Sequence, residues 1–188
     1  MNVIILETSP NPDGLTAACA AAAAEGARQA GASVERVRVN DLEIGSCQAC
    51  GNGWGTCLAE HGCQVEDDFQ PLHQRIVRAD ALILVTPVYW GEMSESAKAL
   101  TDRLRRCEAT RREGSLLSGK PFIAVAAAGG SGGGMITCLA SMERWAQHVR
   151  AQVFDLIPVN RWSREYKLAA IRAAAQAMAE AGSSRQGA

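Results

Sequence analysis

Short apolar runs recur along this chain, and polar loops and segments of helical pattern separate them. The strongest run covers residues 81–85 and has no polar member, as a strand buried on both faces requires. Pro87 is expected to end this strand, because proline cannot donate to a sheet ladder. A helix is expected over residues 93–106, with Ser94 near its start. The pattern at the centre of the chain therefore predicts a buried strand, a loop and a helix in succession.

The same unit, a strand followed by a helix, is expected along most of the chain. The other strands are predicted over residues 3–6, 33–39, 121–128 and 153–159, and the other helices over residues 17–30, 67–78, 135–150 and 165–181. This alternation predicts an α/β fold of three layers with a five-stranded parallel sheet. A single domain is expected over residues 1–182, with 40–66 as a cysteine-rich insertion and 183–188 as a frayed tail.

The first loop, residues 8–16, lies between a predicted strand and an alanine-rich helix and contains hydroxyls and turn formers. Free backbone N–H groups and the helix dipole favour an anion at such a junction, and Ser9 and Thr16 would add hydroxyl donors. The alternative is an ordinary turn in which Thr16 caps the helix. The loop therefore indicates either a phosphate site or a simple turn.

Two further loops follow predicted strands, and ligands of parallel α/β sheets bind at such carboxyl strand ends. Residues 87–94 contain two adjacent rings, Tyr89 and Trp90, which could stack on a flat ligand or pack into the core. Residues 128–134 are rich in glycine, so a bare backbone can approach a ligand closely there. Together with the first loop, they suit a mononucleotide that carries a flat ring.

Composition narrows the classes of function. The 188 residues are 47% hydrophobic and carry a net charge of −1, which argues against a nucleic-acid-binding protein, since that class has a basic excess. No apolar run reaches the length of a membrane span. Residues 1–6 enter a predicted strand without a basic flank or a cleavage site, so a cytoplasmic protein is expected. Its seven cysteines would then lie in a reducing compartment.

The three loops, in this order, resemble those of the flavodoxin-like NAD(P)H-dependent FMN reductases, including their quinone-reductase and iron–sulfur flavoprotein branches. The resemblance covers nearly the whole chain and is carried by Ser9-Pro10 with Gly14 and Thr16, by Thr86-Pro87-Val88-Tyr89-Trp90, by Lys98 with Asp102-Arg103, and by the glycine loop. It implies that the first loop holds the FMN phosphate and that the other two hold the isoalloxazine ring. The residues implied to bind FMN are Ser9, Asn11, Gly14, Leu15, Thr16, Pro87, Val88, Tyr89, Trp90, Gly91, Gly129, Gly130, Ser131 and Gly132.

The resemblance also implies an activity. NAD(P)H would reduce the bound FMN and leave, and a quinone-like or other small-molecule acceptor would then take the electrons. The flavin carries this chemistry itself, so no catalytic side chain is assigned. The alternatives are an iron–sulfur flavoprotein that acts in electron transfer and a flavin-binding module without turnover. Relatives form homodimers or homotetramers, and Lys98, Asp102 and Arg103 are expected to be structural or at a subunit interface. The candidates for further exposed contacts, each of which could instead be core or lid, are Trp145, Arg161, Trp162 and Tyr166.

Four cysteines of residues 40–66 follow the spacing C-x2-C-x6-C-x5-C, at Cys47, Cys50, Cys57 and Cys63. Thiolates at such spacings are the usual ligands of zinc or of an iron–sulfur cluster. The segment also resembles the cysteine region of the iron–sulfur flavoproteins, which runs into a pair of aspartates, as here at residues 67–68. Three outcomes stay open: thiols that are inert or form disulfides on isolation, a [4Fe–4S] cluster, or a structural zinc. The other three cysteines are expected to pack within helices: Cys19, Cys107 and Cys138.

Overall fold

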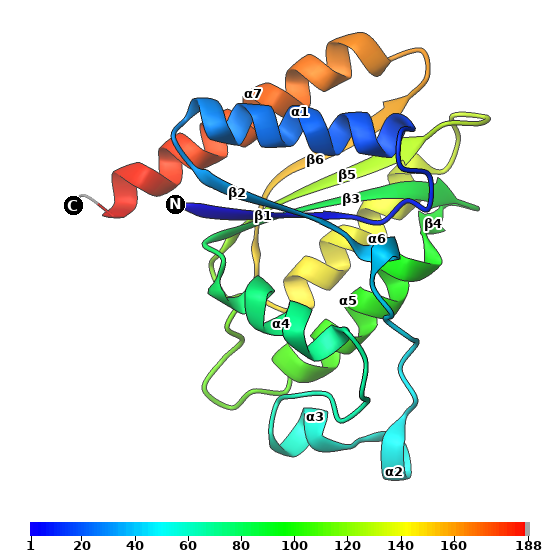
Figure 1. The fold of residues 1–188 in the computed structure, drawn as a ribbon, viewed down its shortest axis with the longest axis vertical. Coiled ribbons are helices and arrows are strands. Elements are labelled where there is room, and N and C mark those ends of the chain that lie inside the picture. The colour runs from blue at the N-terminus through cyan, green and yellow to red at the C-terminus, as the bar shows by residue number, and fades with distance from the viewer. Residues whose placement is uncertain (187–188) are drawn as a thin grey trace.

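The computed structural model describes residues 1–186 and shows the α/β architecture that the alternating pattern predicts (Figure 1). The parallel strands lie in the order β2-β1-β3-β5-β6, as in a flavodoxin-like sheet. They are β1 (Asn2–Glu7), β2 (Ser33–Arg38), β3 (Ala81–Tyr89), β5 (Pro121–Ala128) and β6 (Gln152–Asn160). One face of the sheet is covered by helices α1 (Leu15–Gln29) and α7 (Arg164–Gln186), and the other by α4 (Phe69–Arg78), α5 (Glu95–Glu108) and α6 (Met135–His148).

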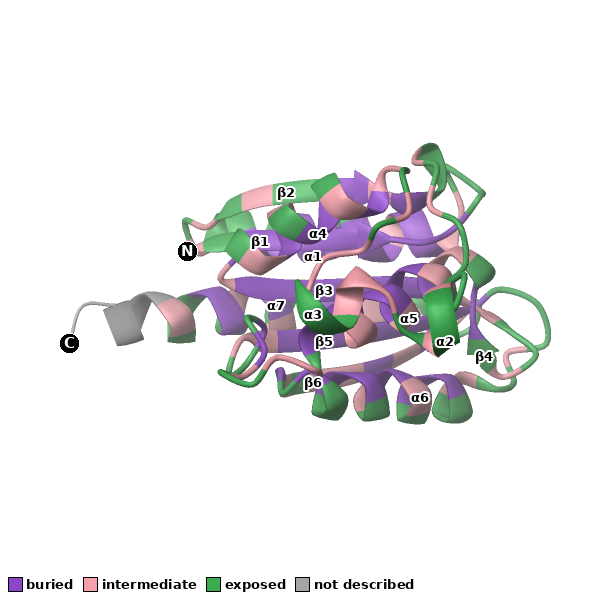
Figure 2. Ribbon diagram, turned by 90° about the horizontal axis from the view of Figure 1, so that it is seen from below, coloured by how far each residue is buried: buried purple, intermediate pink, exposed green. Residues whose placement is uncertain are grey.

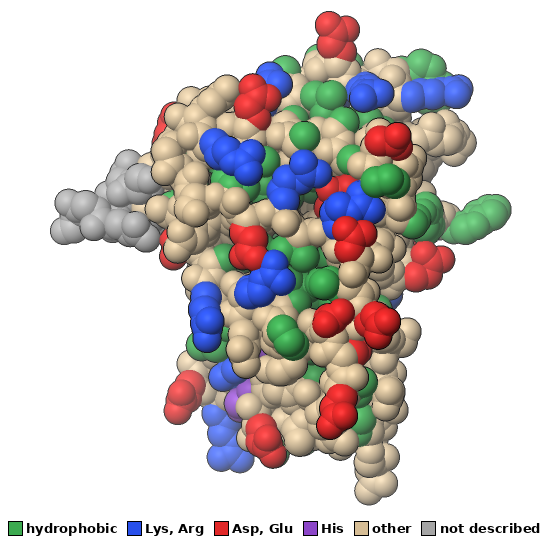
Figure 3. Space-filling view, in the orientation of Figure 1, with side chains coloured by type: hydrophobic (Ala, Val, Ile, Leu, Met, Phe, Trp, Pro, Cys, Tyr) green, Lys and Arg blue, Asp and Glu red, His purple; other side chains and the backbone are tan. Residues whose placement is uncertain are grey.

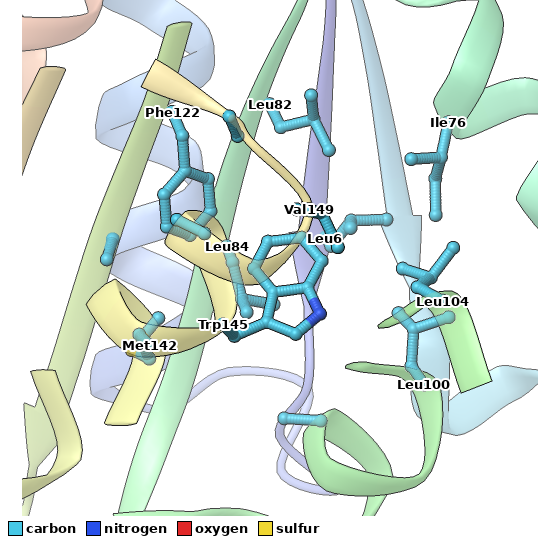
Figure 4. Packing of buried hydrophobic residues seen from close by; sticks show 14 of the residues in the cluster. Leu6, Ile76, Leu82, Leu84, Leu100, Leu104, Phe122, Met142, Trp145 and Val149 are labelled. Carbon is cyan, nitrogen blue, oxygen red and sulfur yellow. The ribbon is translucent and has the colours of Figure 1, made fainter. Parts of the chain in front are cut away.

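The core occupies both faces of the sheet, so the inner strands are buried along most of their length (Figure 2). On the side of α4, α5 and α6, Leu84, Phe122 and Trp145 belong to one large apolar cluster (Figure 4). Trp145, a candidate for an exposed contact, is therefore a core residue, and its indole Nε1 donates to the carbonyl oxygen of Thr101 at 2.9 Å. The opposite face is filled by small alanines of α1 packed on β-branched and other apolar strand residues.

Pro87 does not end the central strand, contrary to the expectation from sequence. β3 continues to Tyr89, and Pro87 pairs with Ala127 of β5. The carbonyl of Val85 accepts the N–H of Thr8 at 3.0 Å, so alternate residues of β3 face β1. Two residues later Pro87 faces the same side, where the pairing of β1 with β3 has already ended. The missing N–H therefore costs no ladder hydrogen bond.

A tight hairpin follows β3, where the sequence suggested that a helix begins at residue 93. Val88 and Tyr89 pair antiparallel with the short strand β4 (Glu92–Met93). Trp90 and Gly91 between them both have positive φ, at 53° and 84°, as a two-residue type I′ turn requires. Helix α5 consequently begins at Glu95, and Ser94 is its N-cap because its Oγ accepts the N–H of Ala97 at 3.3 Å.

The remaining element bounds agree with the predicted ones within two residues, except at the C-terminus. Helix α7 continues to Gln186, so the expected tail over residues 183–188 is wrong for 183–186, and residues 187–188 lie outside the described residues. Gly14, rather than Thr16, occupies the N-cap of α1. Within residues 1–186, no helix combines the length and apolar character needed to cross a membrane.

The cysteine-rich segment lies at the far end of the molecule from α1 and α7 (Figure 1). It contains a 3₁₀ turn, η1 (Val39–Asp41), and two helical turns, α2 (Cys50–Gly53) and α3 (Thr56–Ala59). Its two short helices lie beyond α4 and α5 in Figure 1.

Candidate functional site

The first loop presents backbone donors rather than cations at the carboxyl end of β1. The hydroxyl of Ser9 accepts the N–H of Asn11 at 3.2 Å, and the Asn11 side-chain oxygen accepts the N–H of Asp13 at 3.3 Å. Gly14 at the N-cap offers no side-chain acceptor to α1. Within the described residues, the N–H groups of residues 15–17 therefore have no hydrogen-bond acceptor. Such an uncapped helix start can bind an anionic phosphate.

A chain of hydroxyl hydrogen bonds ties this first loop to the hairpin. The Ser94 hydroxyl donates to the carbonyl oxygen of Thr8 at 2.8 Å, and the Ser94 N–H donates to Oγ1 of Thr86 at 3.1 Å. The Ser96 hydroxyl donates to the same Thr8 carbonyl at 3.2 Å. None of these three residues is among those predicted to bind a ligand, although Ser94 belongs to the predicted loop 87–94 and Thr86 and Ser96 lie close to its ends. Their positions next to the predicted loops were the available signal.

The hairpin and the glycine loop touch each other backbone to backbone. A Cβ atom on Gly134 would lie 2.7 Å from the Cα atom of Gly91, closer than real Cβ contacts come. The hydroxyl of Thr137 donates to the carbonyl oxygen of Gly91 at 2.8 Å and lies 3.0 Å from that of Gly134. Both glycines have positive φ, so their identity is required by conformation as well as by space. The two loops are thereby held in one arrangement.

A pocket of about 550 Å³ lies between these two loops. Its lining residues come from the hairpin, the glycine loop and the start of α6: Val88, Trp90, Gly91, Ala128, Gly130, Ser131, Gly132, Gly133, Gly134 and Thr137. Six of the predicted ring-binding residues are thus brought together, whereas Pro87, Tyr89 and Gly129 lie next to the lining in the chain. The predicted phosphate loop lies outside this pocket. Sequence reasoning missed Ala128, Gly133, Gly134 and Thr137, although all but Thr137 lie within the glycine loop it identified.

The two adjacent rings do not pack into the core. Trp90 is fully exposed at the tip of the hairpin, and Tyr89 is 37% exposed. Hydrophobic side chains project from the surface at the edge where β4 lies in Figure 1 (Figure 3). A tryptophan with φ of 53° is strained, and such backbone outliers cluster at functional sites. Packing into the core, one of the two alternatives for this ring pair, is therefore excluded for Trp90.

A fourth loop, residues 160–163 after β6, reaches the same edge of the sheet. The Asn160 side-chain oxygen accepts the N–H groups of Trp162 at 3.1 Å and of Ser163 at 2.9 Å. Trp162 covers Gly132 so closely that a Cβ atom there would lie 2.6 Å from its ring. The guanidinium carbon of Arg161 lies 4.4 Å from the centre of the Trp162 ring. Trp162 and Tyr166 are exposed, which agrees with their prediction as candidates for exposed contacts.

The predicted cysteines line one small pocket at the other end of α5. Cys47, Cys50, Cys57 and Cys63 are joined there by Cys107, which was expected only to pack within its helix. Cys19, Cys107 and Cys138 are indeed buried, and burial raises the pKa of each thiol to about 12. Within the described residues, no three His, Cys, Asp or Glu side chains are arranged to hold a metal ion. The thiols are soft donors that suit iron or zinc, but their positions do not form a ligand set.

Arg103 of α5 anchors the cysteine-rich segment. Its side chain is 1% exposed and makes a bidentate ion pair with Asp67, at 2.5 and 2.9 Å. It also donates to the carbonyl oxygen of Gly45 at 3.0 Å and to the sulfur of Cys63 at 3.3 Å. Burial acts to raise the pKa of Asp67, but the hydrogen bonds from Arg103 and two backbone N–H groups outweigh it and lower the pKa. The structural role expected of Arg103 is therefore confirmed.

A buried contact between a histidine and a carboxylate joins α4 to α5. Nε2 of His73 lies 2.7 Å from Oε1 of Glu108, and both side chains are buried. The other carboxylate oxygen accepts the N–H of Leu116 at 2.7 Å. Burial acts to raise the pKa of Glu108, but these hydrogen bonds and the charges of His73 and Arg111 outweigh it, so the pKa is lowered. The pair lies away from the pocket of the glycine loop and is structural.

The chain is similar to known proteins in sequence and in fold. The sequence model of the NADPH-dependent FMN reductases matches residues 1–162. An iron–sulfur flavoprotein of Methanocaldococcus jannaschii is 30% identical over 145 residues, which are 77% of this chain and 71% of that protein. An iron–sulfur flavoprotein of Methanosarcina thermophila is 29% identical over 132 residues, and the match spans 70% of this chain but only 65% of that protein. The NAD(P)H:quinone oxidoreductase from Methanothermobacter marburgensis has a similar fold, with a TM-score of 0.70 and 21% identity over 94% of both chains.

Proposed function

The chain belongs to the NADPH-dependent FMN reductase family, and from this membership we propose that it is an FMN-dependent oxidoreductase that passes electrons from a nicotinamide nucleotide to a quinone-like or other small acceptor. The observation that carries the proposal is the pocket between the hairpin and the glycine loop. Its lining is mainly backbone and small side chains and contains no charged group. Such a wall suits a flat aromatic ring that the backbone must approach closely.

The residues present fit FMN at both of its ends. The unpartnered N–H groups of residues 15–17, with the hydroxyl of Ser9 beside them, suit the phosphate. The hairpin residues Val88 to Gly91 and the glycine loop would hold the ring. The hydrogen bond from Ser94 to Thr8 fixes the spacing between the two parts. The first loop has no lysine or arginine, so the phosphate would depend on backbone donors.

Bound FMN would supply the hydride and electron-transfer chemistry, and the protein would supply position and electrostatics. The pocket lining contains no acid or base, so it offers no side chain for proton transfer. The exposed backbone of Gly91 and of the glycine loop could donate hydrogen bonds to a ring that gains negative charge. The work of the chain's own residues is therefore to bind, orient and partly cover the ring.

The proposal is tested by the visible absorption of anaerobically purified protein before and after NADPH is added. Flavin bands that bleach on addition of NADPH, and return when a quinone is added, are the expected result. The same titration with NADH measures the nucleotide preference. A protein that is colourless, and stays so after incubation with FMN, would contradict the proposal.

The second candidate function is electron transfer by an iron–sulfur flavoprotein. The observation that favours it is that five cysteines line one pocket, and relatives such as the two described above carry this name. Because the thiols do not form a ligand set, the segment would have to rearrange to hold a cluster or zinc. Iron, acid-labile sulfide and zinc are to be measured in anaerobically purified protein. Contents near zero for all three would leave the thiols without a metal and remove this candidate.

A further inference from the structure

We infer that Arg161 and Trp162 form the subsite for the adenosine 2′-phosphate half of NADPH. The inference rests on the proposed function and adds the residues that would distinguish NADPH from NADH. The charges of NADPH and of the pocket do not match. NADPH carries a pyrophosphate and a 2′-phosphate, whereas the pocket in which its nicotinamide would lie against the bound flavin ring has no charged residue in its lining. Any cation that binds these phosphates therefore lies outside that pocket.

Arg161 and Trp162 lie directly beside the pocket. Trp162 covers Gly132, which is one of the lining residues, and the two are in close contact. The hydrogen bonds of Asn160 to the N–H groups of Trp162 and Ser163 hold the turn in place. A nucleotide whose nicotinamide entered the pocket and whose other half crossed the glycine loop would meet this turn. The position thus suits the distal half of a dinucleotide.

The charge of Arg161 is free to bind an anion. Two other cations near the carboxyl edge of the sheet are already neutralised: Arg38 pairs with Asp41 at 3.0 Å, and Lys98 pairs with Asp102. Within the described residues, Arg161 and its neighbour Arg164 form no ion pair with an acidic side chain. The guanidinium of Arg161 can make charge-assisted, bidentate hydrogen bonds to a phosphate.

Trp162 supplies the surface on which an adenine can stack. Its ring is 65% exposed although one edge packs on Gly132. Arg161 lies over that ring at 4.4 Å, a cation–π contact that restrains a long side chain before the ligand arrives. Purines stack on aromatic rings and on guanidinium planes in other nucleotide sites. The pair therefore offers both components that an adenosine phosphate requires.

The test uses the FMN-loaded protein and two probes that lack nicotinamide, adenosine 2′,5′-bisphosphate and adenosine 5′-monophosphate. Calorimetry is to measure their dissociation constants in the unaltered protein and in Arg161→Gln and Arg161→Lys. The bisphosphate is expected to bind at least about 10-fold more tightly than the monophosphate, and Arg161→Gln to remove most of this difference, because hydrogen bonds between charged groups have about this strength. Arg161→Lys is expected to retain an intermediate preference, since it keeps the charge and loses the bidentate geometry.

Arg112→Gln is the matched control, because Arg112 is an exposed arginine within the 109–118 loop and remote from the glycine loop. It is expected to bind both probes as the unaltered protein does. Equal affinity for the two probes in the unaltered protein, or an Arg161→Gln variant that keeps the preference, would overturn the inference. Sedimentation of each variant shows whether the surface is a subunit contact instead. If the Arg161→Gln variant dissociates from an oligomer but keeps its preference for the bisphosphate, the surface around Arg161 is a subunit contact.

The outcome separates the inference from the proposed function. A protein that prefers the bisphosphate but whose flavin is not bleached by NADPH would keep the nucleotide subsite and contradict the reductase. A protein whose flavin is bleached equally by NADPH and NADH, without a preference between the probes, would keep the reductase and contradict the role of Arg161.

Discussion

Single residues decide whether the two ring-binding loops can meet. Gly134 has a φ of 78°, and a Cβ atom on it would lie 2.7 Å from the Cα atom of Gly91, which leaves no room for a side chain. We expect Gly134→Ala to weaken FMN binding at least about 10-fold, because the hairpin would have to move away from the glycine loop and the left-handed backbone itself costs about 1–2 kcal/mol. Fluorescence titration of the apoprotein with FMN measures the change.

A second glycine separates these two causes. Gly119 also has a positive φ, at 74°, but a Cβ atom there would touch nothing within 4 Å. Gly119→Ala is therefore expected to lower stability by about the same backbone strain while FMN affinity stays unchanged. Equal losses of FMN affinity in the two variants would mean that the contact between the loops does not shape the site.

A second prediction about a single residue concerns Arg103, which anchors the cysteine-rich segment. Its removal leaves the carboxylate of Asp67 largely buried without its partner, so Arg103→Met is expected to lower the free energy of unfolding by about 3–5 kcal/mol. Urea denaturation measures this, and Arg112→Met is the exposed, unpaired control, expected to change stability by at most about 0.5 kcal/mol. The double variant Arg103→Met with Asp67→Leu should recover part of the loss. A double variant as unstable as the sum of the two single changes would argue against the pairing.

At the scale of elements, α1 and α7 pack on one face of the sheet through small residues. Gly26 of α1 leaves room for the backbone of α7, and a Cβ atom there would lie 2.0 Å from the carbonyl oxygen of Arg172. Alanine at position 26 should favour the isolated helix by about 1 kcal/mol. We nevertheless expect Gly26→Ala to destabilise the protein by about 1–3 kcal/mol, because the two helices would be forced apart.

Thermal unfolding monitored by circular dichroism measures that effect. Ala21 is exposed on the same helix, so Ala21→Gly reports helix propensity alone, at about 1 kcal/mol. If Gly26→Ala were more stable than the unaltered protein by that amount, the close packing of α1 on α7 would be disproved.

For the whole molecule, two partly or fully buried carboxylates link stability to pH. Asp67 joins the cysteine-rich segment to α5, and Glu108 joins α5 to α4 and to the 109–118 loop. Both have a pKa that is lowered in the folded protein. A carboxylate whose pKa is lowered by folding stabilises the folded protein when the pH is above the pKa of the unfolded chain, which is about 4. This stabilisation is lost as the pH falls through the pKa of the folded state.

The titration of these two carboxylates is therefore expected to leave the free energy of unfolding nearly constant between about pH 5 and 7. At pH values below about 4, the free energy of unfolding is expected to decrease. Urea denaturation at a series of pH values measures it. Glu108→Gln should be less stable at pH 7 and should show a shallower decline in acid, because one of the two titrating groups is gone. An identical decline in this variant would show that Glu108 does not contribute.

Local pattern determined most of the architecture. The apolar run at 81–85, the alanine-rich stretch of α1 and the alternation of short and long segments specify strands and helices, because the periods of the backbone are properties of a few consecutive residues. The order of three specialised loops was also sufficient to indicate a site for a mononucleotide with a flat ring, since parallel strands bring their carboxyl ends to one edge. The same local view failed at Pro87, where what mattered was that the neighbouring strand had already ended.

The site itself was decided by contacts between residues far apart in the chain. The packing of Gly134 on Gly91, the cover that Trp162 gives to Gly132, and the arrival of Cys107 at the cysteine pocket leave no periodic signal in the sequence. Each depends on which backbone atoms approach within a few ångströms after the layers have formed. The sequence by itself determined the elements and the chemistry of the loops, and the tertiary structure alone decided which of those loops touch, because close packing joins residues by distance in space rather than by distance along the chain.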